Sequence, residues 1–296
     1  IDVDDAIVWS VAPGRDRAQR LVRIRQTAIR AAWNGDRPAI AHAERAGTGT
    51  LDELALTADE LAAASAAALE LMTPGELAAG DATVVLDPSA AALVLDAVAR
   101  HLPAGEVSPL VTLVDDPTAA GAYGGFAFDD EGELAAPLTL IDRGRVTARL
   151  DERAGRARRP GHLGLVEAAP SHLVLAPGGV APRALYGDGF LLERGVDLAF
   201  DPATDRVRLA CARARELKAG NPTGRVYADV ELVGSLRAVL AAIDGVADAP
   251  ARFALPSLAV TSDATAQAQR GDPVWRSIAA PAIRTRGLVR PRRSRA

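Results

Sequence analysis

After about residue 104 the sequence consists of short β-prone runs separated by glycine, proline and aspartate turns, and this texture constrains the fold most. The runs include residues 108–116 (SPLVTLVDD), 171–179 (SHLVLAPGG) and 224–234 (GRVYADVELVG). Few helical patterns interrupt them, whereas parallel strands need long crossover connections that are usually helical. We therefore predict a large, mostly antiparallel sheet over residues 105–296.

Two hairpins are predicted within this region. The string IDRGRV places Gly144 at a tight turn, and FDPATDRVRL (200–209) places Asp and Pro between two strands. Glycine and aspartate are typical of hairpin turns because they tolerate the backbone angles that such turns require.

The first 104 residues carry most of the helical patterns. Residues 15–35 space Leu21, Ile24, Ala28 and Ala31 at helical intervals before Gly35, which predicts a helix. Thr57 and Glu60 form a capping-box pattern before a second helix. With a strand at the start of the chain, these elements predict an N-terminal α/β lobe over residues 1–104.

A third helix follows the buried strand ATVVLDP. Asp87 suits the N-cap, Pro88 suits the first helical position, and the helix continues through DPSAAALVLDAVARHLP (87–103). A late helix is predicted over residues 234–246 (GSLRAVLAAIDGV). The whole chain is thus predicted to be α+β.

Composition excludes several classes of protein. The chain is 49% hydrophobic and 24% charged, which is typical of a folded globular protein. A net charge of −4 and only local basic runs, at 153–162 and 284–296, argue against a nucleic-acid partner. Cys211 is the only cysteine, which excludes an intrachain disulfide and a multi-thiolate metal site. No apolar run reaches the roughly 18 residues that a membrane span needs, so we expect a cytoplasmic protein.

The sequence lacks the usual local motifs of phosphate binding and nucleophilic catalysis. GAYGGF (121–126) matches neither glycine-rich phosphate loop, and a strand is expected after it rather than a helix. No GxSxG motif is present, and the four histidines lie in unrelated contexts.

Asp129, Asp130 and Glu131, followed by Gly132, allow two interpretations. They could be paired carboxylates for acid–base catalysis or cation ligands. Turn chemistry explains them more simply, because aspartate favours turns and Gly132 supplies a positive φ.

The order of these segments resembles the TldD/PmbA family. The resemblance runs from about residue 80 to 246 and is most specific at GGFAFDDEGELAAPLTLIDRGRV (124–146). That string is similar to the family pattern of an aromatic strand, Asp-Asp-Glu-Gly, and then Thr-x-Leu-Ile-x-x-Gly. In this sequence the pattern corresponds to Asp129, Asp130, Glu131, Gly132, Thr139 and Gly144.

The resemblance implies a zinc peptidase made of two related subunits, TldD-like and TldE-like, with a strongly curved β lobe. The catalytic subunit carries His-Glu-x-x-x-His on the helix that corresponds to residues 87–103, and a later cysteine as a further ligand. This sequence has Asp96, Ala97 and His101 at those positions, and no cysteine near 260–274. A zinc site needs three or four ligands, so the resemblance implies a degenerate site.

Helix geometry agrees with a degenerate site. Residues five apart are separated by about 140° around a regular helix, so Asp96 and His101 would share a metal only on a distorted helix. Asp96 and Arg100 are four apart and are predicted to form an ordinary surface ion pair.

The resemblance therefore implies a metal-free, TldE-like non-catalytic subunit. We expect it to bind no cofactor, to pair with a TldD-like subunit that carries His-Glu-x-x-x-His and zinc, and to enclose an extended peptide substrate. Two alternatives stay open: an independent biosynthetic hydrolase with an atypical metal site at Asp96 and His101 or at the Asp129 cluster, and a homomeric scaffold or binding protein.

Overall fold

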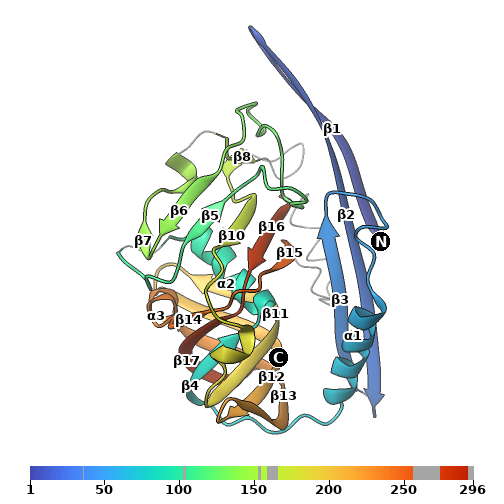
Figure 1. Cartoon of the computed structure of the whole chain (residues 1–296), viewed down its shortest axis with the longest axis vertical. Coiled ribbons are helices and arrows are strands. Elements are labelled where there is room, and N and C mark those ends of the chain that lie inside the picture. The colour runs from blue at the N-terminus through green and yellow to red at the C-terminus, as the bar shows by residue number, and fades with distance from the viewer. Residues whose placement is uncertain (36, 103–104, 153–154, 159–165, 256–273, 293–296) are drawn as a thin grey trace.

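The fold is α+β and dominated by strands, arranged in three main sheets around one buried helix (Figure 1). The structure is a computed structural model. It describes residues 1–296 except 36, 103–104, 153–154, 159–165, 256–273 and 293–296.

The first sheet is a three-stranded antiparallel layer along one side of the molecule (Figure 1). It contains β1 (Asp2–Ala12), β2 (Arg15–Asn34) and β3 (Arg37–Gly47). The helix predicted over residues 15–35 is therefore wrong, because these residues form the 20-residue strand β2. The hairpin of β1 and β2 extends beyond the rest of the molecule (Figure 1).

Helix α1 (Ala58–Glu70) covers part of the outer face of this sheet. Ala67 and Ala68 pack on Ala41 of β3, and Arg45 forms an ion pair with Glu60 at 2.8 Å. The predicted capping box is confirmed: Thr57 accepts from the backbone N–H of Glu60, and the Glu60 carboxylate accepts from the backbone N–H of Thr57.

The inner face of the first sheet is held to the rest of the chain by arginine and glutamine side chains. Arg23 is buried and donates to the carbonyl oxygen of Tyr123 at 2.9 Å. The guanidinium of Arg25 lies over the Tyr123 ring, 5.1 Å from its centroid. Gln19 binds both the N–H of Ala127 and the carbonyl oxygen of Phe128. Because of these contacts, the arginine side chains of β2 can face the protein interior.

The second sheet has six strands in the order β15-β16-β10-β5-β6-β7. Their bounds are β5 (Leu113–Asp115), β6 (Leu138–Asp142), β7 (Arg145–Val146), β10 (His172–Leu175), β15 (Ala251–Leu255) and β16 (Arg276–Ala280). Every pairing is antiparallel except that of β10 with β16. The short β8 (Ala157–Arg158) and β9 (Glu167–Ala168) form a separate pair.

The third sheet has the order β13-β12-β11-β4-β17-β14, and β13 also pairs with β17, so five of its strands close into a ring. Its strands are β4 (Gly80–Leu86), β11 (Gly189–Asp201), β12 (Arg206–Lys218), β13 (Asn221–Ser235), β14 (Gly245–Val246) and β17 (Ile283–Pro291). Closure agrees with the strong curvature implied by the family resemblance. Because β4 pairs with β11 and β17, residues 80–86 belong to the same packed body as the later strands.

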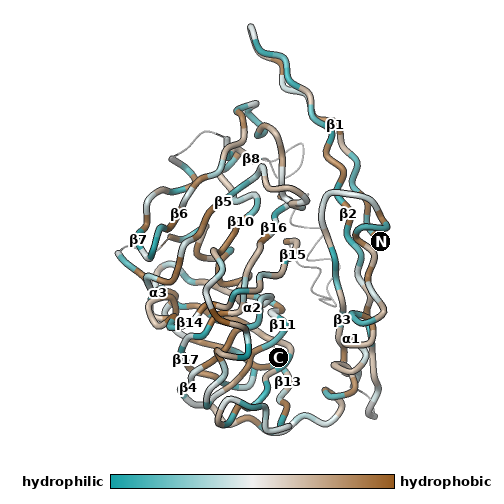
Figure 2. The backbone as a smooth tube through the Cα atoms, viewed as in Figure 1, coloured by the Kyte–Doolittle hydropathy of each residue, from teal (hydrophilic) through white to brown (hydrophobic). Residues whose placement is uncertain are grey.

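Helix α2 (Pro88–Arg100) lies between the second and third sheets and contacts strands of both. Nine of its residues are buried, so it is a core helix rather than an amphipathic surface helix. The predicted start is confirmed, since Asp87 caps the helix through the N–H of Ala90 at 2.8 Å and Pro88 is the first helical residue. The most hydrophobic stretches gather in this region (Figure 2).

The other predictions for the second half have mixed outcomes. Both predicted hairpins are confirmed, between β6 and β7 and between β11 and β12. The late helix α3 is shorter than predicted, at Leu236–Ala241. The strand expected after GAYGGF (121–126) contributes only a bridge between Phe128 and Leu134. Within the described residues, no helix is both long enough and apolar enough to cross a membrane.

Candidate functional site

Asp96 lies in the last turns of α2, and its side chain is buried with 6% exposure. Its Oδ2 lies 2.8 Å from a guanidinium nitrogen of Arg100, and its Oδ1 lies 3.1 Å from the Nε of Arg276 at the start of β16. The prediction of an ion pair with Arg100 is confirmed, but its description as an ordinary surface pair is wrong. One buried carboxylate is shared between two guanidinium groups.

Ala97 and His101 occupy different environments from Asp96. Ala97 is fully buried in the core, whereas His101 is exposed and caps the C-terminal end of α2. The imidazole of His101 lies against the ring of Phe200, with centroids 4.8 Å apart. Partial desolvation and the neighbouring Arg100 lower the pKa of His101, although Asp96 acts in the opposite direction.

The residues at these three positions do not fit a zinc ion. The only carboxylate is already neutralised by two arginines, and Ala97 provides no donor atom. A divalent cation would have to displace both guanidinium groups or sit beside them, with His101 as the only other ligand. Among the described residues, no group of three or more His, Cys, Asp or Glu side chains could hold a metal. Residues 260–273, near which the family cysteine would fall, lie outside the described part of the chain.

A cavity of about 450 Å³ opens beside this end of α2. Its charged and polar walls include Arg100, His101, Arg149, Asp151 and Arg276. The cavity is thus lined by both signs of charge, and Arg149 has no ion pair among the described residues.

Asp129 is the organising residue of the Asp129–Gly132 turn, not a free carboxylate. It is buried, and its Oδ1 accepts from the N–H groups of Glu131 at 3.0 Å and Glu133 at 2.8 Å. Its Oδ2 accepts from the N–H of Ala157 at 2.9 Å. Gly132 has φ of +80°, as the turn interpretation requires. Backbone donors therefore use the oxygens that acid–base catalysis would need.

This turn is also where the β1–β2 hairpin docks. Arg17 donates to the carbonyl oxygen of Gly132, and Arg15 donates to that of Glu131 at 2.9 Å. A Cβ on Gly132 would lie 2.0 Å from the Ser10 hydroxyl oxygen, and φ is positive here, so a larger residue would disturb this close approach. The side chains of Asp130 and Glu131 are exposed. The structure thus assigns the acidic motif a role in assembly of the fold.

Thr139 and Gly144 belong to the β6–β7 hairpin. The backbone carbonyl of Thr139 accepts from the Thr147 hydroxyl at 2.7 Å, and Gly144 has φ of +82° in the turn. Among the described residues, neither Thr139 nor Gly144 forms a hydrogen bond with Asp96. The six family-motif positions are therefore distributed between a turn and a hairpin instead of one reaction centre.

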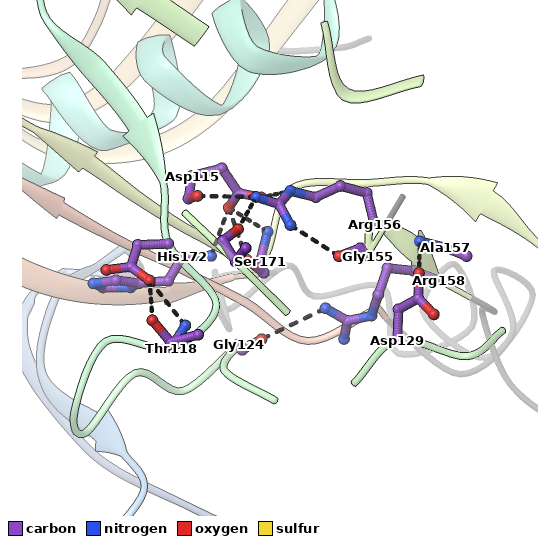
Figure 3. Close-up of polar contacts among 12 residues, drawn as sticks. Asp115, Thr118, Gly124, Asp129, Gly155, Arg156, Ala157, Arg158, Ser171 and His172 are labelled. Carbon is purple, nitrogen blue, oxygen red and sulfur yellow. Dashed lines mark hydrogen bonds and ion pairs between the residues drawn. The ribbon is translucent and has the colours of Figure 1, made fainter. Parts of the chain in front are cut away.

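Asp115 and Arg156 form a buried ion pair that the sequence does not reveal (Figure 3). The Nε of Arg156 is 2.8 Å from Oδ2 of Asp115, and both side chains have exposures of 2% or less. The Oδ1 of Asp115 accepts from the N–H and hydroxyl of Ser171 and from the N–H of His172. The two charged residues are 41 positions apart, so no local spacing connects them.

His172 and Ser277 resemble a nucleophile–base pair, but their burial excludes that role in this conformation. The His172 Nδ1 lies 2.8 Å from the Ser277 hydroxyl oxygen, which also accepts from the N–H of Gly124. The two residues are 1% and 3% exposed. Burial, with a smaller contribution from Arg252, lowers the pKa of His172 to about 4. A neutral, enclosed imidazole joins three segments of the fold here.

Cys211 is a buried residue of β12, and burial raises the pKa of its thiol well above the usual value. A protonated, enclosed thiol is a poor nucleophile and a poor metal ligand.

Comparison with known families decides the wider assignment. The model of the PmbA/TldA metallopeptidase C-terminal domain matches residues 104–289, which is well over half of the chain. The chain belongs to the TldD/PmbA family. No curated protein matches the sequence.

Solved structures show the same fold. A candidate modulator of DNA gyrase from Thermotoga maritima aligns over 93% of this chain with a TM-score of 0.71, and one from Bacteroides thetaiotaomicron aligns over 94% with a TM-score of 0.69. TldE from Thermococcus kodakarensis aligns over 93% with a TM-score of 0.67. Identity is 14% in each case, so these comparisons concern the fold alone.

The chain spans less than two thirds of these structures, covering 64%, 62% and 64% of their lengths respectively. Because these alignments cover 93% or more of this chain, they include residues before 104, which the family model does not match. The TldD/PmbA fold thus includes the first sheet as well as the two sheets around α2.

Proposed function

We propose that this chain is the metal-free, non-catalytic subunit of a heterodimeric TldD/TldE-type metallopeptidase that acts on peptides in the cytoplasm. The observation that supports this proposal most is the pairing of Asp96 with both Arg100 and Arg276. Two fixed cations lie where the family's catalytic subunits carry the first zinc ligand.

The catalytic groups would come from the partner. A TldD-like chain would supply His-Glu-x-x-x-His and the zinc ion, which polarises the scissile carbonyl and its bound water. In this chain Ala97 takes the glutamate position and has no group that accepts a proton. The role left for this chain is to shape the substrate chamber and to stabilise the partner.

Two strand edges support a role in holding an extended peptide. β1 and β15 are the outer strands of their sheets, and each pairs with one neighbour among the described strands. A peptide that adds to such an edge is held mainly by backbone hydrogen bonds, so different side chains are tolerated. Precursor maturation and degradation of unfolded chains both need this tolerance.

The test is reconstitution with a TldD-like partner from the same genome. The variant His101→Gln, alone and with Asp96→Asn, should keep peptide hydrolysis by the complex within about twofold of the wild type. Replacing the glutamate of the partner's motif by glutamine should lower the rate by about 10²–10⁴, as expected for loss of a general base. Circular dichroism of each variant checks that the fold is retained.

An opposite pattern would contradict the proposal. If the chain alone hydrolyses peptides, and if His101→Gln abolishes that activity in a folded protein, the chain is an independent enzyme. If no partner is found and no peptide is cleaved by any combination, the scaffold alternative is supported instead.

A further inference from the structure

Residues 1–70, which form the first sheet and α1, have a small apolar core of their own. We name them the arm, and we name the described residues from 80 onward the body (Figure 1). Ala41 of β3 packs with alanines of α1 inside the arm. The two larger apolar clusters contain only residues from Leu77 onward, so among the described residues no apolar cluster is shared by the arm and the body.

Polar and charged groups join the arm to the body. Two arginines of β2 donate to backbone carbonyl oxygens of the Asp129–Gly132 turn. At the end of α1, the Glu70 carboxylate lies 2.8 Å from a guanidinium nitrogen of Arg213 and 2.6 Å from one of Arg215. Contacts of this kind replace hydrogen bonds to water and are weakened by salt, so their net contribution to docking is small.

Docking also buries two further arginines of β2. Arg23 is 4% exposed and donates to the carbonyl oxygen of Tyr123, and Arg25 is 2% exposed and lies over the ring of the same tyrosine. Burial lowers the pKa of Arg23, although Asp4 acts in the opposite direction. Removing a guanidinium from water costs free energy that its new contacts must offset. Undocking would return both groups to water, which lowers the net free energy that undocking requires.

The apolar residues on the inner face of the arm are left largely exposed. Ile29 and Trp33 lie on the same face of β2 as Arg23, because an even number of positions separates them, and Ile40 lies opposite Ala31 on that face. The exposures of Ile29, Trp33 and Ile40 are 49%, 65% and 39%. Hydrophobic burial, the main favourable term in most protein association, is therefore small between the arm and the body.

A cavity of about 350 Å³ lies at the junction of the two parts. His42 and Glu44 of β3 form the arm's share of its wall, and residues at the start of α2, in β11 and in β15 form the body's share. The covalent connection between the arm and the body is residues 71–79, which contain no helix or strand. Movement of the arm about this connection would open one side of the cavity.

We infer that the arm is a gate: residues 1–70 undock from the body as a folded unit, pivot about residues 71–79 and open the cavity between β3 and β15. The docked and undocked forms differ mainly in charged contacts, so salt shifts the equilibrium toward the undocked form. The arm thereby controls how far the cavity is open to solvent. This inference rests on the contacts between the arm and the body and does not depend on the proposed function.

Thiol labelling of the full chain tests the gate. Ala254→Cys places a thiol on the cavity wall at a position that is 1% exposed, and a bulky maleimide should react with it only in the undocked form. Between ionic strengths of about 0.01 M and about 1 M, the labelling rate should rise by about tenfold. Ala92→Cys, on the α2 wall of the cavity and also 1% exposed, is a second position that should behave in the same way.

Two controls separate undocking from other effects of salt. Ala62→Cys, at an exposed position of α1, corrects for the salt dependence of the labelling reaction itself. The buried native thiol of Cys211 should stay unlabelled, which excludes global unfolding. Labelling of the cavity thiols that does not change with salt, or that Cys211 matches, would overturn the inference.

Removing one docking contact should act as salt does. Glu70→Gln weakens the bonds from the arm to Arg213 and Arg215, and should raise the labelling rate at low salt by about fivefold. The control Glu216→Gln removes an ion pair with Arg225 that lies wholly in the body, and should leave the rate unchanged. Equal labelling rates in the two folded variants would overturn the inference. Because the labelling needs neither partner nor metal, its failure would leave the subunit assignment unaffected.

Discussion

Asp115, Asp96 and Asp129 are three of the buried carboxylates of this chain, and each is engaged in a different way. Asp115 is paired with Arg156 and with the donors of Ser171 and His172. Asp96 is shared by two arginines, and Asp129 is bonded to backbone N–H groups. Buried charges that are this well satisfied are typical of structural positions, because a reacting carboxylate needs a free oxygen.

Replacing Asp115 should be costly, because Arg156 would be left as an unpaired buried cation. We expect Asp115→Asn to lower the free energy of unfolding by about 3–5 kcal/mol, measured by urea denaturation. Glu131→Gln, at an exposed position of the acidic turn, is the matched control and should stay within about 0.5 kcal/mol of the wild type. A loss below about 1 kcal/mol for Asp115→Asn would show that the pair is not buried in solution.

His172 should make stability depend on pH. Burial lowers its pKa from 6.5 to about 4, so between these values the unfolded chain binds a proton that the folded chain does not. This contribution destabilises the fold as pH falls through that window and is absent above it. Between pH 7 and pH 5 it should amount to about 2 kcal/mol. His172→Asn should show a correspondingly smaller difference between urea denaturation at the two pH values, and an unchanged difference would contradict the burial.

At the scale of elements, local patterns predicted starts and turns well and failed where distant contacts decide the structure. Asp87, the Thr57–Glu60 capping box and the Gly144 turn depend on neighbours within a few residues, and the structure confirms them. In β2 the apolar residues satisfy helical spacing, but the chain is extended and pairs with β1 and β3, and Arg23 also donates to the carbonyl oxygen of Tyr123, 100 positions away. No periodicity contains that information.

The candidate site likewise combines one contact that a local pattern predicts with others that depend on distant segments. The spacing of Asp96 and Arg100 predicted their ion pair, because residues four apart on a helix are adjacent. The second arginine, Arg276, is 180 positions from Asp96 and reaches it only because β16 packs on α2. For the same reason the cavity of about 350 Å³ between β3, the start of α2, β11 and β15, which four separate segments build, has no signature in the sequence.

The β6–β7 hairpin offers a sharp test of turn geometry. In Gly144 a Cβ would lie 2.6 Å from the Val107 carbonyl oxygen, and φ is +82°. We expect Gly144→Ala to destabilise the protein by about 1–3 kcal/mol in thermal or urea unfolding. The control is Gly187→Ala, where a Cβ meets nothing within 4 Å, and it should be nearly neutral. Equal stability of the two variants would contradict the described turn.

For the whole molecule, α2 connects two cavities of different character. At its C-terminal end, where the family resemblance would place the zinc ligands of a catalytic subunit, this chain has two arginines on one aspartate. At its N-terminal end, a cavity of about 350 Å³ is lined by Glu44, Asp87 and Arg194 together with apolar residues of α2 and β15.

Native mass spectrometry of the chain, purified from its own host, tests the central claim most directly. It reads subunit composition and bound metal in one measurement. The account predicts a one-to-one complex with a second, TldD-like chain, and one metal ion that stays with that second chain on dissociation. A homomer in which this chain retains stoichiometric metal would contradict it and would make Asp96 and His101 true ligands.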